Sequence, residues 1–409
     1  MVGGGIFAVL GEAVSLAHSA TTLAFLFAGI VALLTSYSYA KLSVAYQSEG
    51  GTVTFIDKGF GHNLFSGSVN LMLWLSYLVT ISLYAVAFAS YGETFFTQKS
   101  LLLHHALISI AIVLPALINL VSASFVSKSE TFIVVIKVVL LVVIIVSGAS
   151  YVDTDRLALG ENFAPLSVVV AGMIIFVAYE GFELIANAAE EIKNPAKNLP
   201  RAFYASVSFV ILLYILIAII SVGTVPEAEL LEAKDYALAI AAKPALGTIG
   251  FTIVAVAALL ATFSAINATI YGNARLGYII ATEGELPGLL SREKREIPFM
   301  GVIITLALSL LLANSIDLNA IAIIGSASFL LIFFIVNLSA YRLRKEIGAR
   351  VSILTFSITA TFCALVILLY HTYSSNPNAI IIFFLFIVIS FCFEYFYGRL
   401  IRKKIFLEQ

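Results

Sequence analysis

The sequence has few charged residues. Asp, Glu, Lys and Arg together make up 11% of its 409 residues, whereas about a quarter of the residues in soluble domains are charged. Hydrophobic residues account for 61%, and the mean hydropathy is +1.04. This composition excludes an ordinary soluble domain and predicts an integral membrane protein.

The sequence also lacks the usual signs of a disulfide framework, an enzyme active site, a metal site and a secretory signal. Cys363 and Cys392 are the only cysteines and lie in apolar runs, so we expect small core residues and no disulfide framework. No nucleophile–base constellation or phosphate-binding loop is visible, so we expect no enzyme, no cofactor and no nucleic-acid partner. The five histidines lack metal-ligand spacing, which predicts no metal site. Met1 and Val2 carry no basic charge, which argues against a secretory signal.

Long apolar runs, by contrast, are abundant. A helix needs about 20 apolar residues to cross roughly 30 Å of hydrocarbon, and the sequence offers about a dozen such runs. Residues 6–17 are too short to cross alone and are predicted to be the second half of a broken helix. Short helices are expected at residues 52–60 and 237–242. The expected spans are 20–39, 71–96, 107–124, 131–151, 167–191, 203–222, 249–271, 301–313, 320–340, 353–370 and 380–396.

Basic residues are distributed unevenly between the two sides of the membrane. With these spans, Lys99, Arg156, Lys234 and Lys243 fall on one side, Lys137 falls inside the membrane, and every other Lys and Arg falls on the opposite side. Cytoplasmic loops carry the excess of Lys and Arg. We therefore predict a multi-pass plasma-membrane protein whose basic side and C-terminus are cytoplasmic.

Two apolar helices are interrupted by residues that do not suit a continuous span. One interruption lies at residues 180–183, where the sequence reads Glu-Gly-Phe-Glu, and the other at the three glycines of residues 3–5. Irregular backbone at membrane depth is tolerated only where it is buried in protein or lines a wet cavity. Two such breaks are the best indication in a sequence of a transporter's midplane site.

The two breaks offer complementary partners for a zwitterion. The N–H groups of a glycine run at a helix N-terminus favour an anion such as a carboxylate, and carbonyl groups at the C-terminal end of a half-helix favour an ammonium group. The alternative is that the glycines and aromatic residues only allow close helix packing. The candidate substrate-binding residues are Gly3, Gly4, Gly5, Ile6, Phe176, Tyr179, Glu180, Gly181 and Phe182.

Lys137 lies about nine residues, or roughly 13 Å, into its apolar span. A charged ammonium group at that depth is costly unless it is paired or faces water, and buried lysines gain and lose protons readily. The alternative is that Lys137 extends its side chain to the membrane surface. Glu183 near the break, and Thr262 and Ser264 in a later span, are further candidates for proton coupling, although hydroxyl groups often bond to their own helix.

The chain resembles the amino acid-polyamine-organocation (APC) transporter superfamily in an ordered set of motifs. It is most similar to prokaryotic proton-coupled amino-acid permeases, which carry a lysine in the fifth helix, where Lys137 stands. The matching stretches are residues 3–7 (GGGIF), 49–52 (EGGT) with 59–63, 176–183 (FVAYEGFE), 190–195 (EEIKNP) with 199–201, and 267–272 (NATIYG) with 283–287 (EGELP).

The resemblance implies an all-α polytopic fold with a five-plus-five inverted repeat and two extra C-terminal helices. It implies one transmembrane domain that comprises a first repeat at residues 1–151, a second repeat at 165–345, and two helices and a tail at 351–409. It also implies that the Lys137 ammonium occupies the place of the cation in sodium-coupled relatives, between helices one, five and eight. This placement makes Thr262 and Ser264 candidates for the same site. In that family a half-helix precedes the glycines, and here it is missing, so we expect a longer natural chain.

The sequence as a whole predicts a secondary transporter that moves amino acids by alternating access, with protons as the coupling ion. An amino-acid exchanger or a sodium-coupled carrier is the alternative within the class, and a non-transporting amino-acid sensor is the alternative outside it. Glu180 stands where relatives often carry an apolar residue, so the side-chain class of the substrate stays open. The expected partners are the amino acid, protons and the lipid bilayer.

Overall fold

The computed structural model describes residues 1–121, 123–159, 163–294 and 297–400, and the side chains of residues 123–131 are not part of that description. Within these ranges the chain is helical and holds no strand beyond one isolated bridge, so the all-α prediction is confirmed. The longer helices are α1 (Gly5–Ala17), α2 (Thr21–Ala45), α4 (Leu64–Glu93), α5 (Leu101–Val121), α6 (Ala123–Gly148), α7 (Pro165–Ile174), α8 (Pro195–Thr224), α11 (Lys243–Thr282), α12 (Phe299–Ser315), α13 (Leu318–Arg342), α14 (Val351–Ser375) and α15 (Pro377–Leu400).

Short helices occupy the turns and connections. The two predicted ones are present as α3 (Thr52–Phe60) and α10 (Ala237–Ala241), and α9 (Glu227–Ala233) precedes the latter. The 3₁₀ helices are η1 (His18–Ala20), η2 (Ala149–Tyr151), η3 (Thr154–Leu157), η4 (Ile175–Tyr179), η5 (Glu183–Glu191) and η6 (Lys234–Tyr236).

Ten helical stretches of the described chain are long and apolar enough to cross a membrane, which supports the polytopic prediction. The stretch at residues 5–45 holds two of the predicted elements, because η1 joins α1 to α2 and His18 interrupts them with a φ of 51°. The apolar helix α12 is shorter. The predicted tail beyond residue 400 lies outside the described residues.

The start of one helix and the location of the two cysteines differ from the predictions. The span before α8 ends at Glu191 as expected, but α8 begins at Pro195, before the predicted residue 203, and contains Pro200. Proline suits the first helical position, where its missing N–H would be unpaired anyway, and Pro200 removes one bond close to the helix start. Cys363 and Cys392 are exposed on α14 and α15 and are not core residues.

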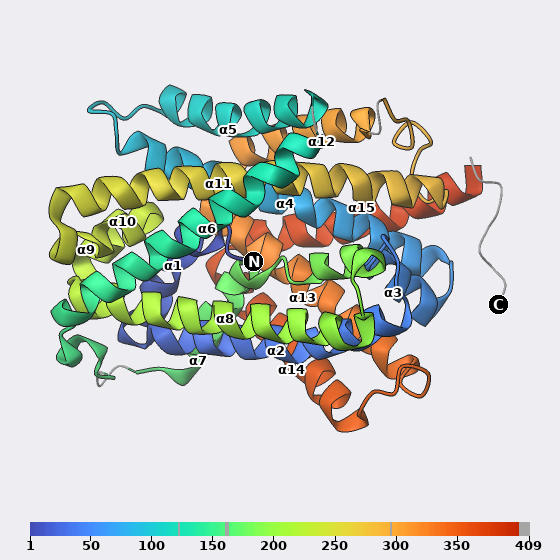
Figure 1. The fold of residues 1–409 in the computed structure, drawn as a ribbon, viewed down its shortest axis with the longest axis horizontal. Coiled ribbons are helices and arrows are strands. Elements are labelled where there is room, and N and C mark those ends of the chain that lie inside the picture. Colours follow the sequence, from blue (N-terminus) through green and yellow to red (C-terminus); the bar gives the residue numbers. More distant parts are fainter. Residues whose placement is uncertain (122, 160–162, 295–296, 401–409) are drawn as a thin grey trace.

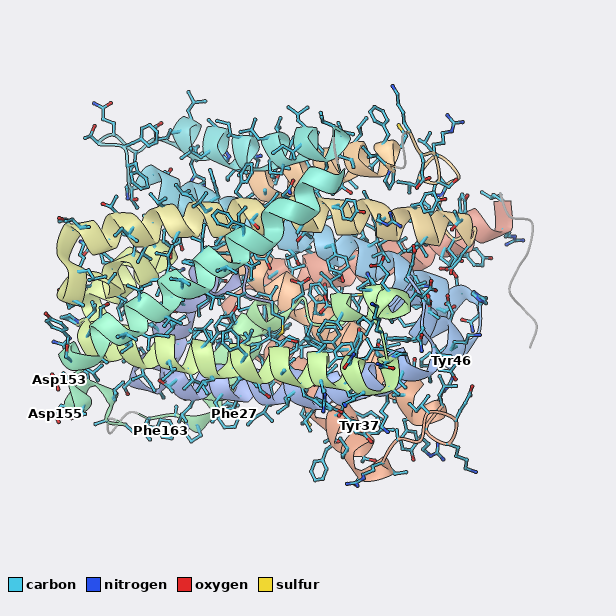
Figure 2. All side chains as sticks on the ribbon, viewed as in Figure 1. Phe27, Tyr37, Tyr46, Asp153, Asp155 and Phe163 are labelled. Carbon is cyan, nitrogen blue, oxygen red and sulfur yellow. The ribbon has the colours of Figure 1, made fainter. Side chains whose placement is uncertain are left out.

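The long helices run side by side, so the molecule has two ends (Figure 1). We name them the η6 end, which carries α9, η6 and α10, and the α3 end, which carries α3 and the end of α15. Figure 2 places Asp153 and Asp155 at the η6 end and Tyr46 toward the α3 end. The N-terminal residue appears midway between the two ends in Figure 1.

Helices α4 and α13 form the centre of the bundle. In the most apolar 18-residue stretch of each helix, 89% of the residues are buried in α4 and 83% in α13. The corresponding share is 28% in both α5 and α15. A helix that is apolar all round and buried belongs to a core, and one with exposed apolar side chains suits contact with lipid. The interrupted helix α7–η4–η5 is also largely buried, which places its break inside the protein.

Candidate functional site

The two helix breaks lie against each other. Gly181 adopts a φ of 108°, and a Cβ atom there would lie 2.8 Å from the backbone nitrogen of Met1. A Cβ atom on Gly5 would lie 2.8 Å from the Cα of Ala178, so glycine is needed for this approach. The start of α1 therefore packs directly on the point where η4 ends and η5 has not yet begun.

A cavity of about 430 Å³ opens beside this junction. Four of the residues singled out from the sequence line it, namely Gly3, Lys137, Glu180 and Gly181. Lys137 comes from α6 and is 2% exposed, and Glu180 comes from the break and is 5% exposed. The cavity thus brings together a buried basic side chain and a buried acidic one, where a polar ligand can be recognised by charge.

Both glutamates of the break accept hydrogen bonds from tyrosines of α4. Tyr84 Oη donates to Glu180 Oε2 at 3.3 Å, and Tyr77 Oη donates to Glu183 Oε1 at 3.1 Å. The backbone N–H of Gly181 donates to Glu183 Oε2 at 2.8 Å. Glu183 is fully buried and does not line the cavity, so its carboxyl group ties the irregular backbone to α4.

The aromatic candidates belong to a packed cluster and not to the cavity lining. Phe182 packs against Tyr39 with ring centroids 5.5 Å apart and against Phe333 at 5.1 Å. Phe176 meets Phe333 at 5.9 Å. Tyr179 donates a hydrogen bond from its hydroxyl group to the Phe25 carbonyl at 2.8 Å. In this structure these rings pack around the break and face away from the cavity lining.

The remaining candidates lie next to the site without lining it. Thr262 donates its hydroxyl proton to the Ala258 carbonyl of its own helix at 2.7 Å. Its methyl carbon would lie 2.9 Å from a Cβ atom on Gly4, so α11 packs closely on the glycine run. Gly4, Gly5, Ile6 and Ser264 are likewise buried or close-packed beside the cavity.

Sequence reasoning did not assign Tyr84 and Tyr77 to the site, although they contact both carboxyl groups. They are seven residues apart, two turns on one face of α4, which is the signal that could have identified them. Tyr214 was also missed. Its hydroxyl group lies 3.3 Å from the carbonyl oxygens of Met1 and Ala178 and so bridges the two breaks.

Comparison with known proteins decides the family. The family model described as amino acid permease matches residues 1–393. The chain belongs to the amino acid permease family. It is 36% identical to the uncharacterized protein MJ0609 of Methanocaldococcus jannaschii over 92% of this chain and 87% of that protein.

Two further relatives of this permease are named as transporters. The inner membrane transport protein YbaT of Escherichia coli is 35% identical over 93% of this chain and 89% of its own length. The methylthioribose transporter of Bacillus subtilis is 26% identical over 85% of this chain and 78% of its own length. The permease is therefore a multi-pass membrane transporter of this family.

At the η6 end of the permease, the connection between α8 and α11 packs on α1. Gly11 of α1 lies against the Lys234 carbonyl, and a Cβ atom at residue 11 would overlap that carbonyl. Lys234 Nζ also pairs with Glu12 Oε2 at 3.4 Å, and Glu12 accepts a hydrogen bond from Asn319. Backbone therefore packs directly on backbone at this end of the molecule.

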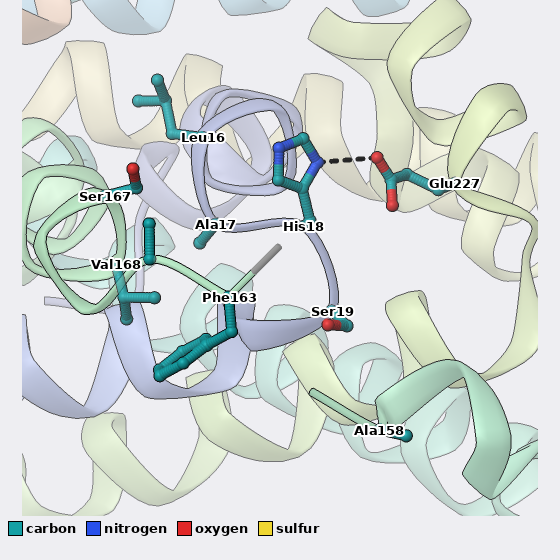
Figure 3. A pocket seen from close by; sticks show the side chains of 10 residues that line it. Leu16, Ala17, His18, Ser19, Ala158, Phe163, Ser167, Val168 and Glu227 are labelled. Atoms are coloured by element: carbon teal, nitrogen blue, oxygen red, sulfur yellow. Dashed lines mark hydrogen bonds and ion pairs between the residues drawn. The ribbon is translucent and has the colours of Figure 1, made fainter. Parts of the chain in front are cut away.

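A separate hollow of about 400 Å³ lies near the η6 end, between the α1–α2 turn and the start of α7 (Figure 3). His18 Nδ1 lies 2.7 Å from Glu227 Oε1 at its rim, as the dashed line in Figure 3 marks. Both side chains are about half exposed. None of the candidate residues from the sequence lines this hollow.

Toward the α3 end, a vestibule of about 350 Å³ adjoins the cavity. Leu184 and Ala268 line both spaces, so the two lie side by side. Arg275 and Glu49 also line the vestibule and form an ion pair at 3.1 Å, with side chains 40% and 58% exposed. The permease is thus tightly packed between α1 and η6 at one end and hollowed toward the other.

Proposed function

We propose that this permease carries amino acids across the plasma membrane by alternating access and couples their movement to protons. The observation that carries the proposal is that Lys137 and Glu180, a basic and an acidic residue that are both buried, line the same cavity. That cavity lies at the meeting point of two broken helices. Intramembrane ionisable residues that face a cavity mark substrate or ion pathways.

Each end of the substrate has a partner of opposite polarity in this proposal. The substrate carboxylate lies at the N-terminus of α1, next to Gly3, because the first N–H groups of a helix favour an anion and α1 has no side-chain cap. The substrate ammonium faces Glu180. Tyr84 orients that carboxylate through its hydroxyl group.

Lys137 is the proposed proton carrier. Its side chain is 2% exposed yet borders the cavity, so its ammonium proton can exchange only with groups that enter or line that space. Movement of that proton changes the charge facing Glu180 and the substrate. Substrate binding and protonation are thereby linked at one place.

The proposed orientation places the α3 end in the cytoplasm. The side of the chain predicted to be cytoplasmic from its basic residues includes Lys58 on α3 and Arg275 at the vestibule. The arrangement described here is then the inward-facing one. The C-terminus lies on the same side.

Uptake of radiolabelled amino acids into proteoliposomes tests this function. We expect an inward proton gradient to drive accumulation in the wild type and not in Lys137→Ala, while exchange of labelled for unlabelled amino acid across the same membrane persists in the variant. Lys197→Ala, at an exposed position of α8, is the matched control and should accumulate substrate like the wild type. Accumulation by Lys137→Ala equal to the wild type would remove Lys137 from coupling.

The same vesicles separate the alternatives. Accumulation driven by a sodium gradient alone would indicate a sodium-coupled carrier, and exchange without net uptake would indicate an exchanger. Saturable binding of an amino acid with neither uptake nor exchange would indicate a sensor. Methylthioribose, which lacks the carboxylate and ammonium groups, should compete poorly if the charged ends are recognised as proposed.

A further inference from the structure

A second group of polar side chains is buried at the α3 end, outside the cavity lining. Asn70 Nδ2 donates to Glu285 Oε2 at 2.8 Å and to Asp57 Oδ1 at 3.2 Å. His62 Nδ1 lies 3.6 Å from Asp57 Oδ2. These four side chains come from α3, the α3–α4 turn, α4 and the segment after α11, so residues 57–70 meet the distant residue 285 here.

The group holds more acceptors than donors. Asp57, Asn70 and Glu285 are 7%, 0% and 3% exposed, so water does not solvate them freely. Within the described part of the chain, neither Asp57 Oδ2 nor Asn70 Oδ1 accepts a hydrogen bond. Buried acceptors of this kind ordinarily have a donor, and an acceptor left without one points to a missing water or ion. The amide of Asn70 stands between the two carboxyl groups, so its unpaired oxygen belongs to the same site.

We propose that Asp57, His62, Asn70 and Glu285 form a binding site for a divalent metal ion of the Mn²⁺ class. Asp57, His62 and Glu285 each offer one ligand atom, and these atoms all lie within 4.8 Å of one another. Ligands at about 2.0–2.2 Å from a common ion are separated by distances in this range. A half-turn of the Asn70 amide replaces its N–H donors by Oδ1 and adds a fourth ligand.

The ligand types select the class of ion. Carboxylate and amide oxygens suit Mg²⁺, Ca²⁺ and Mn²⁺, whereas imidazole is a ligand for transition metals. Two carboxyl groups with one imidazole and one amide oxygen therefore favour Mn²⁺. His62 is exposed, so the ion has a path from solvent to the buried oxygens.

The positions of the carboxyl groups fit a cation. Asp57 and Glu285 are both nearly buried and both accept from the single amide of Asn70, so two acidic groups lie close together. A divalent ion bound between them would hold α3, α4 and the segment after α11 together.

This site was not expected from the sequence, which gave no metal-ligand spacing. His62 and Asp57 are five residues apart, but Glu285 is more than 200 residues further along the chain. Only the fold brings it to Asp57 and Asn70. The site does not share a lining residue with the Lys137 cavity, so it is independent of the proposed transport function.

Titration of Mn²⁺ into the purified, chelator-stripped full chain tests the site. We expect the electron paramagnetic resonance signal of free Mn²⁺ to reveal one saturable site, and the thermal unfolding midpoint to rise with Mn²⁺ because only the folded state binds. Asp57→Asn and Glu285→Gln should abolish the site. His62→Ala should weaken it by at least about tenfold, the loss that even outer-shell partners of metals cause. Glu49→Gln is the control, because Glu49 is an exposed carboxylate at the same end and lies outside the site.

Three results would overturn the proposal. One is the absence of saturable Mn²⁺ binding to the wild type. Another is unchanged affinity in His62→Ala, which decides the question even if the buried variants fail to fold, because His62 is exposed and its replacement leaves the core intact. A loss of Mn²⁺ affinity in Glu49→Gln equal to that in His62→Ala would also overturn it, since the loss would then reflect the general surface charge.

Discussion

At the η6 end of the molecule, backbone packs directly on backbone, whereas at the α3 end half-exposed side chains face each other across a vestibule. Gly11 lies against the Lys234 carbonyl at the first end, and Arg275 pairs with Glu49 at the second. Close packing resists small displacements, while exposed ion pairs contribute little. The η6 end is therefore packed firmly, whereas the α3 end is held together only loosely.

This difference indicates which contacts would change in the transport cycle proposed above. In the proposed alternating access, the firmly packed end opens while the hollowed end closes around the fixed site. Opening the η6 end requires η6 to leave the surface of α1, and closing the α3 end requires η5 to approach α11 near Leu184 and Ala268. Substitutions at the two ends should thus change the unfolding free energy by amounts that differ in size and in sign.

The largest effect is expected from Gly11→Ala. The added methyl group would overlap the Lys234 carbonyl, so η6 must move away from α1. Overpacking of this kind costs about 1–3 kcal/mol of unfolding free energy. Thermal unfolding of the purified protein measures the loss, and Gly11→Ala should also speed the labelling of a cysteine introduced at exposed Glu232 beside η6.

The control for this substitution is Gly272→Ala in α11. A Cβ atom at Gly272 meets nothing within 4 Å, and alanine favours a helix over glycine by about 1 kcal/mol. Gly272→Ala should therefore keep or raise the unfolding midpoint. Equal destabilisation by both substitutions would show that the η6 contact is not specially tight.

A smaller effect is expected at Lys234, which holds a φ of 33°. Lys234→Ala and Lys234→Gly both remove the ion pair with Glu12, but only glycine relieves the left-handed backbone. After glycine's greater freedom in the unfolded chain is counted, Lys234→Gly should be more stable than Lys234→Ala by about 0.5–1 kcal/mol. An alanine variant at least as stable as the glycine variant would contradict this account of the turn.

The η6 end should also show its own pH dependence. Burial raises the pKa of Asp235, although Lys234 and the Ser90 hydroxyl group partly offset the effect. The folded state then holds the Asp235 proton more tightly than the unfolded state, whose pKa is about 3.9. The stability from this group is complete below that value and declines as pH rises through the folded-state pKa.

Asp235→Asn removes that decline. The unfolding midpoint of the variant, relative to the wild type, should therefore be higher at pH 8 than at pH 4. Asp155→Asn, at an exposed carboxylate of the same end, is the matched control and should leave the wild-type slope in place. A parallel shift of Asp235→Asn at all pH values would argue against titration of this group.

The sequence was informative where a residue conflicts with its surroundings. Lys137 in an aliphatic run and the sequence Glu-Gly at residues 180–181 both violate the rules for a membrane helix, and both residues of opposite charge line the cavity. Their roles in transport stay predictions. The break itself follows from Gly181, whose φ of 108° few other residues adopt.

Contacts between distant segments could not be predicted in this way. Tyr84 and Tyr77 are ordinary aromatic residues in an apolar helix until the fold sets them opposite Glu180 and Glu183. The aromatic candidates show the converse, because Phe176 and Phe182 lie near the break in sequence but turn toward Phe333. The local sequence thus predicts where a helix breaks. The direction of each side chain near the break depends on tertiary packing, which the local sequence does not predict.

The smallest effect is expected at the vestibule. The Arg275–Glu49 pair is about half exposed, so a double-mutant cycle with Arg275→Ala and Glu49→Gln should give a coupling free energy below about 1 kcal/mol, weaker still at high salt. The same cycle at Lys234 and Glu12 should give a larger coupling, because Glu12 is only 11% exposed. Each cycle compares unfolding free energies of four proteins and cancels the separate costs of the single changes. A vestibule coupling larger than the one at the η6 end would reverse the comparison, since the hollowed end would then be the more firmly held.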